Sequence, residues 1–146
     1  MKNVRSLSPK LPLVYNPSQG YQMNTGFVEL VQQNLKMILL TSPGERIMDP
    51  EFGVGLKNYL FEQNVQQVHG DISARIKRQV KKYLPSVEIN AVDFFTPENT
   101  PGIPENYLNI RVSFHVKPLD LDTRMELFFD SKRGLFTDGF NAGRII

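Results

Sequence analysis

Three carboxylates lie close together in one short segment, TSPGERIMDPEFGVGL, at residues 41–56. Glu45, Asp49 and Glu51 could supply the acid pair of a glycoside hydrolase, in which two carboxyl groups flank the scissile bond. The general acid of such a pair needs an apolar pocket that raises its pKa. This segment is instead rich in charges, prolines and glycines, and Arg46 can keep neighbouring acids ionised. We interpret the acids as capping and salt-bridge groups. A muramidase-type hydrolase that uses Glu45 with Asp49 or Glu51 is the alternative.

Other residue types that carry chemistry are sparse. His69 and His115 are the only two histidines, and they have neither a nearby nucleophile motif nor metal-ligand spacing. We place His69 in a loop and His115 on the polar face of a strand. Gly53-Val54-Gly55 lacks the further residues of a phosphate-binding loop, so it predicts a tight turn. Because the chain has no cysteine, disulfides and thiolate metal sites are excluded. We expect no enzymatic activity, no cofactor and no metal.

A cluster of cations occupies the outer face of a predicted helix. Single-strand binders interleave such cations with aromatic side chains, which are absent here. The net charge of +2 is also too small to indicate nucleic acid or a membrane as partner. Both a solvated face and docking onto an acidic protein surface fit the cluster. Its members are Arg75, Lys77, Arg78, Lys81 and Lys82.

Length and composition predict one soluble domain. The chain has 146 residues, of which 40% are hydrophobic and 22% charged, an ordinary globular balance. No apolar run approaches the ~20 residues of a membrane span. The N-terminal segment has no continuous apolar stretch of the kind found in a secretory signal.

Two long helices and one short helix are predicted around the acidic segment. The first covers residues 25–40, with Asn24 or Thr25 as its N-cap, and Pro43 prevents its continuation. Residues 56–62 form the short helix. The second long helix starts at an Asp71 N-cap and stops at Pro85. The positions expected to be buried are Phe27, Leu30, Val31, Leu35, Ile38, Leu39, Leu56, Tyr59, Leu60, Ile72, Ile76, Val80 and Tyr83 or Leu84.

The remainder of the chain predicts strands. Val87–Phe95 alternates imperfectly, which indicates a bulge or burial on both faces. Residues 107–117 alternate clearly, residues 123–129 form the next strand, and the turn-rich residues 96–106 form a surface loop. These elements predict an α+β fold. A small antiparallel sheet packs against two long helices and one short helix, with extended N- and C-terminal segments.

The pattern divides the chain into three parts. Residues 1–24 form an N-terminal arm with a short strand at Leu11–Tyr15 and a turn at Asn16–Gly20. Residues 25–130 form the α+β domain. Residues 131–146 repeat glycine and show neither the helix nor the strand period. Both an arm that orders on binding and a frayed terminus fit this tail.

The motif around the acidic segment, NLKMILLTSPGERIMDPEFGVGLKNYLFE, resembles the signature of a known family. This is the sheath-initiator family of contractile-tail baseplates, which comprises phage baseplate wedge proteins called "lysozyme-like" and type VI secretion relatives. The resemblance extends more weakly to about Phe129. The matching positions are Thr41, Pro43, Gly44, Glu45, Arg46, Pro50, Phe52, Gly53 and Leu60-Phe61-Glu62.

The resemblance implies a structural role in a virion tail baseplate that is assembled in the host cytoplasm. Members bind the core-bundle proteins of the baseplate wedge and exchange strands with the first ring of tail sheath protein, so they template sheath polymerisation. Tube or hub proteins are further implied neighbours. Six-fold baseplate symmetry imposes a ring of copies, and we expect a monomer outside the assembly. The "lysozyme" label is then historical.

One departure concerns the wedge contact. The family carries Glu-Pro-Arg where the basic helix meets the next strand, but this chain has Leu84-Pro85-Ser86. The contact is therefore weakened, or it moves to neighbours such as Lys81, Lys82 and Glu88. The residues that we expect to bind partners are Glu45, Arg46, Phe52, Arg75, Arg78, Lys81, Lys82 and Pro85. Those expected to shape the turn are Pro43, Gly44, Pro50, Gly53 and Gly55.

Overall fold

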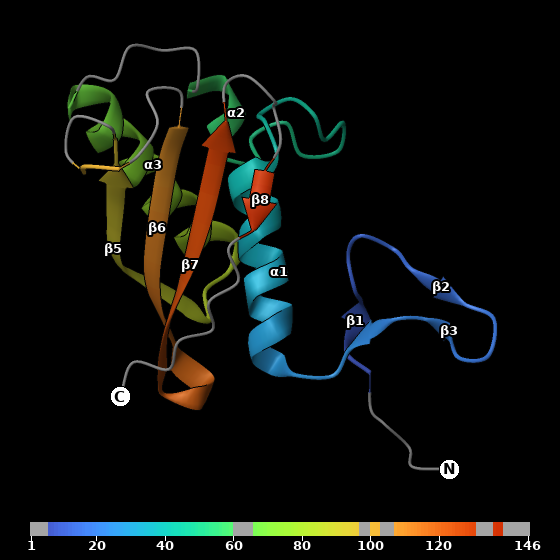
Figure 1. Ribbon diagram of the computed structural model, residues 1–146. Helices are drawn as coiled ribbons and strands as arrows, with labels where there is room; N and C mark the ends of the chain where they lie inside the picture. The colour runs from blue at the N-terminus through green and yellow to red at the C-terminus, as the bar shows by residue number, and fades with distance from the viewer. Residues whose placement is uncertain (1–5, 60–65, 97–99, 103–106, 131–135, 139–146) are drawn as a thin grey trace.

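A four-stranded antiparallel sheet, in the order β5-β6-β7-β8, carries helices α1 and α3 on one of its faces (Figure 1). The computed structural model describes residues 6–59, 66–96, 100–102, 107–130 and 136–138. The expected α+β class is confirmed for these residues. The helices are α1 (Phe27–Leu40), α2 (Leu56–Tyr59), α3 (Gln66–Tyr83) and the 3₁₀ turn η1 (Lys117–Leu119). The strands of this sheet are β5 (Val87–Phe95), β6 (Tyr107–Val116), β7 (Leu121–Asp130) and β8 (Phe136–Asp138).

The core lies between the two helices and the inner face of the sheet. Every second residue of β6 from Ile110 to Val116 is buried, as the alternating pattern predicted. These side chains meet the apolar stripes of α1 and α3, in which Leu35 and Ile76 are fully buried. Each large apolar side chain buried in this way contributes about 1.5–3 kcal/mol. None of the described helices is long and apolar enough to cross a membrane.

Helix α1 ends as predicted but begins differently. The helix stops at Leu40, before Pro43, and Thr41 Oγ1 donates a hydrogen bond to the Met37 carbonyl at 2.6 Å. The expected cap by Asn24 or Thr25 is wrong, because the N-cap is Gly26, which has no side chain to cap the helix. Asn24 is buried instead, and its amide donates to Gln33 Oε1 at 2.9 Å. A contact with Gln33 of α1 therefore takes the side chain that local reasoning assigned to the helix end.

Helix α3 starts earlier than the predicted Asp71 cap. It begins at Gln66, so Asp71 is an exposed interior residue, and Gly70 lies in the helix. Gly70 costs about 1 kcal/mol relative to alanine. His69 therefore lies in a helix and not in a loop, and its ring stacks on Phe94 with centroids 4.4 Å apart. The local sequence favours a helix start at Asp71. Packing of the preceding turn on β5, through His69 and Phe94, extends the helix back to Gln66.

The sheet confirms the expected irregularity in β5 and adds a strand. The register between β5 and β6 shifts between Ile89 and Ala91, which is the predicted bulge. In the segment expected to be a tail, Phe136–Asp138 pair with β7 as β8. Three residues are too few to show an alternating pattern, so the sequence carried no signal for this strand. Residues 60–62, much of the 96–106 loop and residues 139–146 lie outside the described residues.

The N-terminal arm, residues 6–24, projects from the base of α1 (Figure 1). It contains two small antiparallel ladders, β1 (Ser8–Pro9) with β4 (Met23–Asn24), and β2 (Tyr15–Asn16) with β3 (Gly20–Tyr21). The turn after Asn16 is confirmed, but the strand expected at Leu11–Tyr15 contains only Tyr15 of those residues. Gln33 of α1 attaches the arm: its side chain accepts from Leu11 N at 3.0 Å and donates to Pro9 O at 3.0 Å.

Candidate functional site

The candidate site is the elbow, defined as residues 41–55, which connects α1 to α2. Several hydrogen bonds within it and to α1 fix its path, so the segment is a defined structure and not a loose loop. Glu45 helps to close it, because its Oε2 accepts from Ser42 N at 3.1 Å. The backbone hydrogen bonds are Gly44 N to Pro50 O (2.9 Å), Glu45 N to Ser42 O (3.1 Å), Phe52 N to Asp49 O (3.1 Å) and Val54 N to Ile38 O (2.9 Å).

The glycines of the elbow have distinct roles. Gly44, Gly53 and Gly55 have φ angles of +89°, +105° and +70°, which side-chain-bearing residues rarely adopt. Gly53 also lies against the end of α1. A Cβ at this position would be 2.1 Å from the Thr41 carbonyl oxygen. Glycine is therefore required at residue 53 both by its backbone angle and by close backbone packing. At Gly44 only the backbone angle matters, because nothing lies within 4 Å of an added Cβ.

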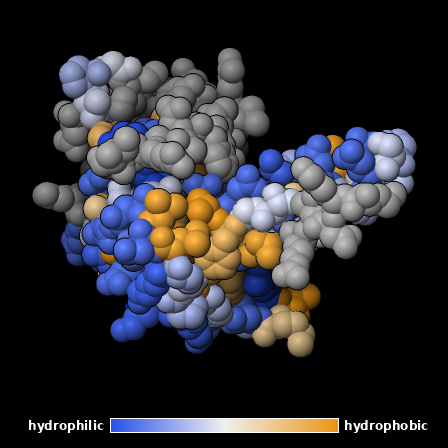
Figure 2. Space-filling view, turned by 90° about the horizontal axis from the view of Figure 1, so that it is seen from below, coloured by the Kyte–Doolittle hydropathy of each residue, from blue (hydrophilic) through white to orange (hydrophobic). Residues whose placement is uncertain are grey.

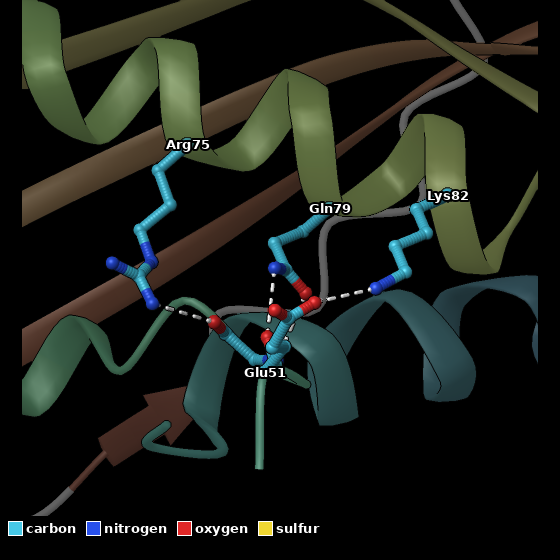
Figure 3. Close-up of polar contacts among 5 residues, drawn as sticks. Glu51, Arg75, Gln79 and Lys82 are labelled. Carbon is cyan, nitrogen blue, oxygen red and sulfur yellow. Dashed lines mark hydrogen bonds and ion pairs between the residues drawn. The ribbon is translucent and has the colours of Figure 1, made fainter. Parts of the chain in front are cut away.

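Helix α3 holds the elbow through three polar side chains (Figure 3). Gln79 is buried; its Nε2 donates to Glu51 O and its Oε1 accepts from Gly53 N, both at 2.9 Å. Arg75 Nη2 donates to Gly53 O at 3.4 Å. Lys82 Nζ forms an ion pair with Glu51 Oε2 at 2.9 Å, and this hydrogen bond raises the pKa of Lys82. We call Arg75, Gln79 and Lys82 the α3 latch.

An aromatic contact with α3 also anchors the elbow. Phe52 is buried, as expected, and its ring meets Tyr83 of α3 edge-to-face with centroids 4.8 Å apart. The Arg46 guanidinium lies 3.6 Å from the Phe52 ring centroid, in cation–π geometry. Partial burial raises the pKa of the Tyr83 hydroxyl. Arg46 and Phe52, two expected partner-binding residues, are thus engaged within the chain.

The carboxylates of the elbow do not form an enclosed acid pair. Glu45 is exposed and closes a turn, and the Glu51 side chain is 80% exposed and paired with Lys82. Glu51 is thus a surface salt-bridge group, whereas the general acid of a glycosidase sits in an apolar pocket. Two grooves on the described surface, one between α3 and β5 and one beside Phe52, are lined by other residues and not by Glu45, Asp49 or Glu51. The geometry offers nothing that supports the muramidase alternative.

The predicted basic face divides into two groups. Arg75 and Lys82 belong to the α3 latch, whereas Lys77, Arg78 and Lys81 are exposed. Pro85, expected to bind a partner, is also exposed and follows the end of α3. The second group therefore remains available to a partner.

Sequence reasoning missed one residue that holds the elbow and one pair within it. Gln79 was assigned no role, although it lies three residues after Ile76 and therefore continues the buried stripe of α3. A polar residue at such a position is a signal for a buried hydrogen-bonding role. Ile47 and Met48 were also assigned no role, yet they are 93% and 96% exposed on an ordered turn. These two neighbours form a small exposed apolar patch on the elbow.

The family comparison agrees with the motif that this elbow contains. The profile of the family "Baseplate wedge protein gp25" matches residues 26–118, which is more than half of the chain and includes the whole elbow. The chain belongs to the gp25 baseplate wedge family. It is accordingly a structural component of the tail baseplate in a contractile machine. The N-terminal arm lies outside the matched residues. No curated protein is similar enough in sequence to count as a match.

Solved structures show the same fold. A chain in the six-fold symmetrised baseplate of the anti-feeding prophage is 24% identical with a TM-score of 0.62; the match covers 73% of this chain and 82% of that one. A Geobacter sulfurreducens protein, provisionally named a tail lysozyme, is 23% identical with a TM-score of 0.62, covering 78% and 99%. A chain in the postcontracted pyocin R2 baseplate is 19% identical with a TM-score of 0.52, covering 71% and 97%.

Proposed function

We propose that this baseplate wedge component initiates the tail sheath. In this proposal it docks on the core bundle of the wedge and offers its sheet to a strand from the first sheath ring. Six copies around the tail would then present six equivalent starting points, next to the tube and hub proteins. The role is structural, and no residue acts as a catalyst.

The observation that carries the proposal is the open edge of β5. Among the described residues, β5 pairs with β6 on one side only, and it is nine residues long. An unpaired edge presents free backbone N–H and C=O groups that can accept a strand from another chain. β8, at the other edge, has three residues and offers a shorter template. Strand addition needs no special side chains, so it agrees with the lack of an enclosed acid pair.

The rigid elbow supports the docking half of the proposal. Its hydrogen bonds and the α3 latch fix the position of α1 relative to α3, and both helices carry the sheet. A fixed frame transmits the position of the wedge to the β5 edge, so every copy would present that edge in the same orientation. The exposed pair Ile47 and Met48 gives the elbow an apolar tip for a neighbouring subunit.

A disulfide trap tests the sheath contact, because the chain has no native cysteine. Asp93 is exposed on β5, so Asp93→Cys places a thiol beside the open edge. We expect it to form a disulfide with a cysteine placed along a terminal segment of a cysteine-free sheath protein when tails assemble. Ser113→Cys on the central strand β6 is the matched control and should give no cross-link.

The opposite result would also be clear. Thr137→Cys places a second test cysteine, on β8. If sheaths of normal length grow but neither Asp93→Cys nor Thr137→Cys cross-links to the sheath protein, the prediction of strand exchange at this sheet is wrong. Cross-links from β8 alone would move the receiving edge and leave the initiation role in place.

A further inference from the structure

A groove of about 440 Å³ lies between the C-terminal half of α3 and the start of β5. Its apolar lining comes from Val80 of α3, from Pro85 just after that helix, and from Val87 and Ile89 of β5. The volume is within the range of about 300–1,000 Å³ found for ligand sites. Figure 2 shows the molecule from below, where apolar surface gathers between hydrophilic side chains. The groove is separate from the elbow, because none of its lining residues belongs to residues 41–55.

The rim of this groove is basic. Lys77, Lys81 and Lys117 line it with one acid, Glu88, and all four side chains are exposed. Glu88 Oε2 lies 3.6 Å from Lys117 Nζ, so the single acid already has a cation. Among the described residues, Lys77 and Lys81 have no carboxylate partner. The two lysines without a carboxylate partner favour an occupant with negative charge, and the apolar lining favours one with apolar side chains.

The spacing of the two lysines describes that occupant further. Lys77 and Lys81 are four residues apart on α3, which places their Cβ atoms about 5–6 Å apart on the same face. Two carboxylates four residues apart on a helix, or two residues apart on an extended chain, have a similar separation. The apolar lining of the groove then takes an apolar side chain from the same segment.

A nucleic acid fits the groove less well. Phosphates need cations but gain nothing from an apolar floor, and base stacking needs aromatic side chains. The groove lining contains no aromatic residue. A protein segment that carries both carboxylates and apolar side chains satisfies the rim and the floor together.

We propose that this groove binds an acidic, amphipathic segment of a neighbouring baseplate protein. The inference rests on the proposed docking to the wedge and names the chemistry of one contact. It also shifts the expected basic contact, because Arg75 and Lys82 hold the elbow, whereas Lys77 and Lys81, with Lys117, face the partner. An ionic contact here would compensate for the charged pair that this chain lacks at Leu84-Pro85-Ser86.

Zero-length carbodiimide cross-linking tests the contact, since it joins a lysine only to a carboxylate that touches it. We expect sheath-free baseplates to yield isopeptide bonds from Lys77 and Lys81 to acids within one segment of another baseplate protein. Both lysines should also lose reactivity toward an acetylating reagent relative to the free chain. The Lys82–Glu51 pair, with a separation of 2.9 Å, is the internal control and should cross-link in both samples.

Charge reversal supplies the matched variants. Lys77→Glu with Lys81→Glu should weaken retention in sheath-free baseplates about tenfold or more, because two favourable ion pairs become repulsive. Arg78→Glu is exposed on the same helix but outside the groove, and it should leave retention unchanged. Sheath nucleation, scored separately by electron microscopy, distinguishes a failure of this contact from a failure of sheath initiation.

Several results would overturn the proposal. Full acetylation of Lys77 and Lys81 in assembled baseplates would show that the groove is empty. Cross-links to Asp120 or Asp122 would identify a second copy of this chain as the occupant, since that exposed segment also combines carboxylates with leucines. Protection of the lysines that is lost on nuclease treatment would assign the groove to nucleic acid.

Discussion

Replacing Gly53 with alanine tests whether the elbow is held by close backbone packing. The added Cβ would lie 2.1 Å from the carbonyl oxygen and 2.8 Å from the carbonyl carbon of Thr41. Both atoms are backbone at the end of α1, so no side-chain rotation can relieve the overlap. The φ angle of +105° adds a second cost, because alanine rarely adopts it.

The magnitude follows from these two contributions. A residue held in a rarely populated backbone region costs about 1–3 kcal/mol. Forcing an extra carbon into a packed site costs about 1–3 kcal/mol more. Gly53→Ala should therefore lower the free energy of unfolding by about 2–6 kcal/mol, a large share of the roughly 5–15 kcal/mol of a typical domain. Gly44→Ala is the control: its φ is +89° but no atom lies within 4 Å, so it bears only the first cost.

Urea denaturation of the purified chain, followed by circular dichroism, measures the difference. At an unchanged slope, the midpoint of Gly53→Ala should fall well below that of Gly44→Ala, by at least about 1 kcal/mol in free energy. The reasoning is refuted if both variants unfold at the same urea concentration. A Gly53→Ala chain that is unfolded without urea, next to a folded Gly44→Ala chain, agrees with the prediction.

Two further predictions concern α3. Gln79→Leu leaves Gly53 N and Glu51 O without their partner, so thermal denaturation should show a chain destabilised by about 1–3 kcal/mol. The control Gln67→Leu, at an exposed position of the same helix, should change stability little. Equal effects of the two substitutions would contradict a specific role of Gln79 in the latch. Burial lowers the pKa of His69 below its ordinary value of 6.5, so the unfolded chain binds this proton at higher pH than the folded one. Stability should therefore fall as the pH drops below about 6.5, and His69→Phe, which can keep the stack on Phe94, should reduce that fall; an identical pH profile in both proteins would refute it.

Sequence reasoning succeeded where one local pattern dominated. The stripe of α1 and the stop at Pro43 predicted its C-terminal end, and the alternation in β6 predicted both its bounds and its inward face. The irregular pattern of Val87–Phe95 correctly indicated a bulge. In each case the signal lay within one continuous segment and needed no knowledge of the partner element.

The failures involve contacts between distant residues. Asn24 suited an N-cap locally, but Gln33 and Ser8 take its side-chain amide. Asp71 suited a helix start, but the helix continues back to Gln66. The latch between Gln79 and Gly53 joins residues 26 positions apart, so no local pattern could reveal it. The prolines and glycines of the elbow predicted its turns, whereas the side chains that fix it come from α3.

The central claim is that this baseplate wedge component starts the sheath through its sheet edge. High-resolution electron microscopy of intact tails tests it most directly, because the first sheath ring and this chain would be seen together. The account predicts a sheath-derived strand beside β5, antiparallel or parallel, continuing the sheet of every copy. A first sheath ring that contacts other baseplate proteins while both edges of this sheet are free of sheath segments would contradict it.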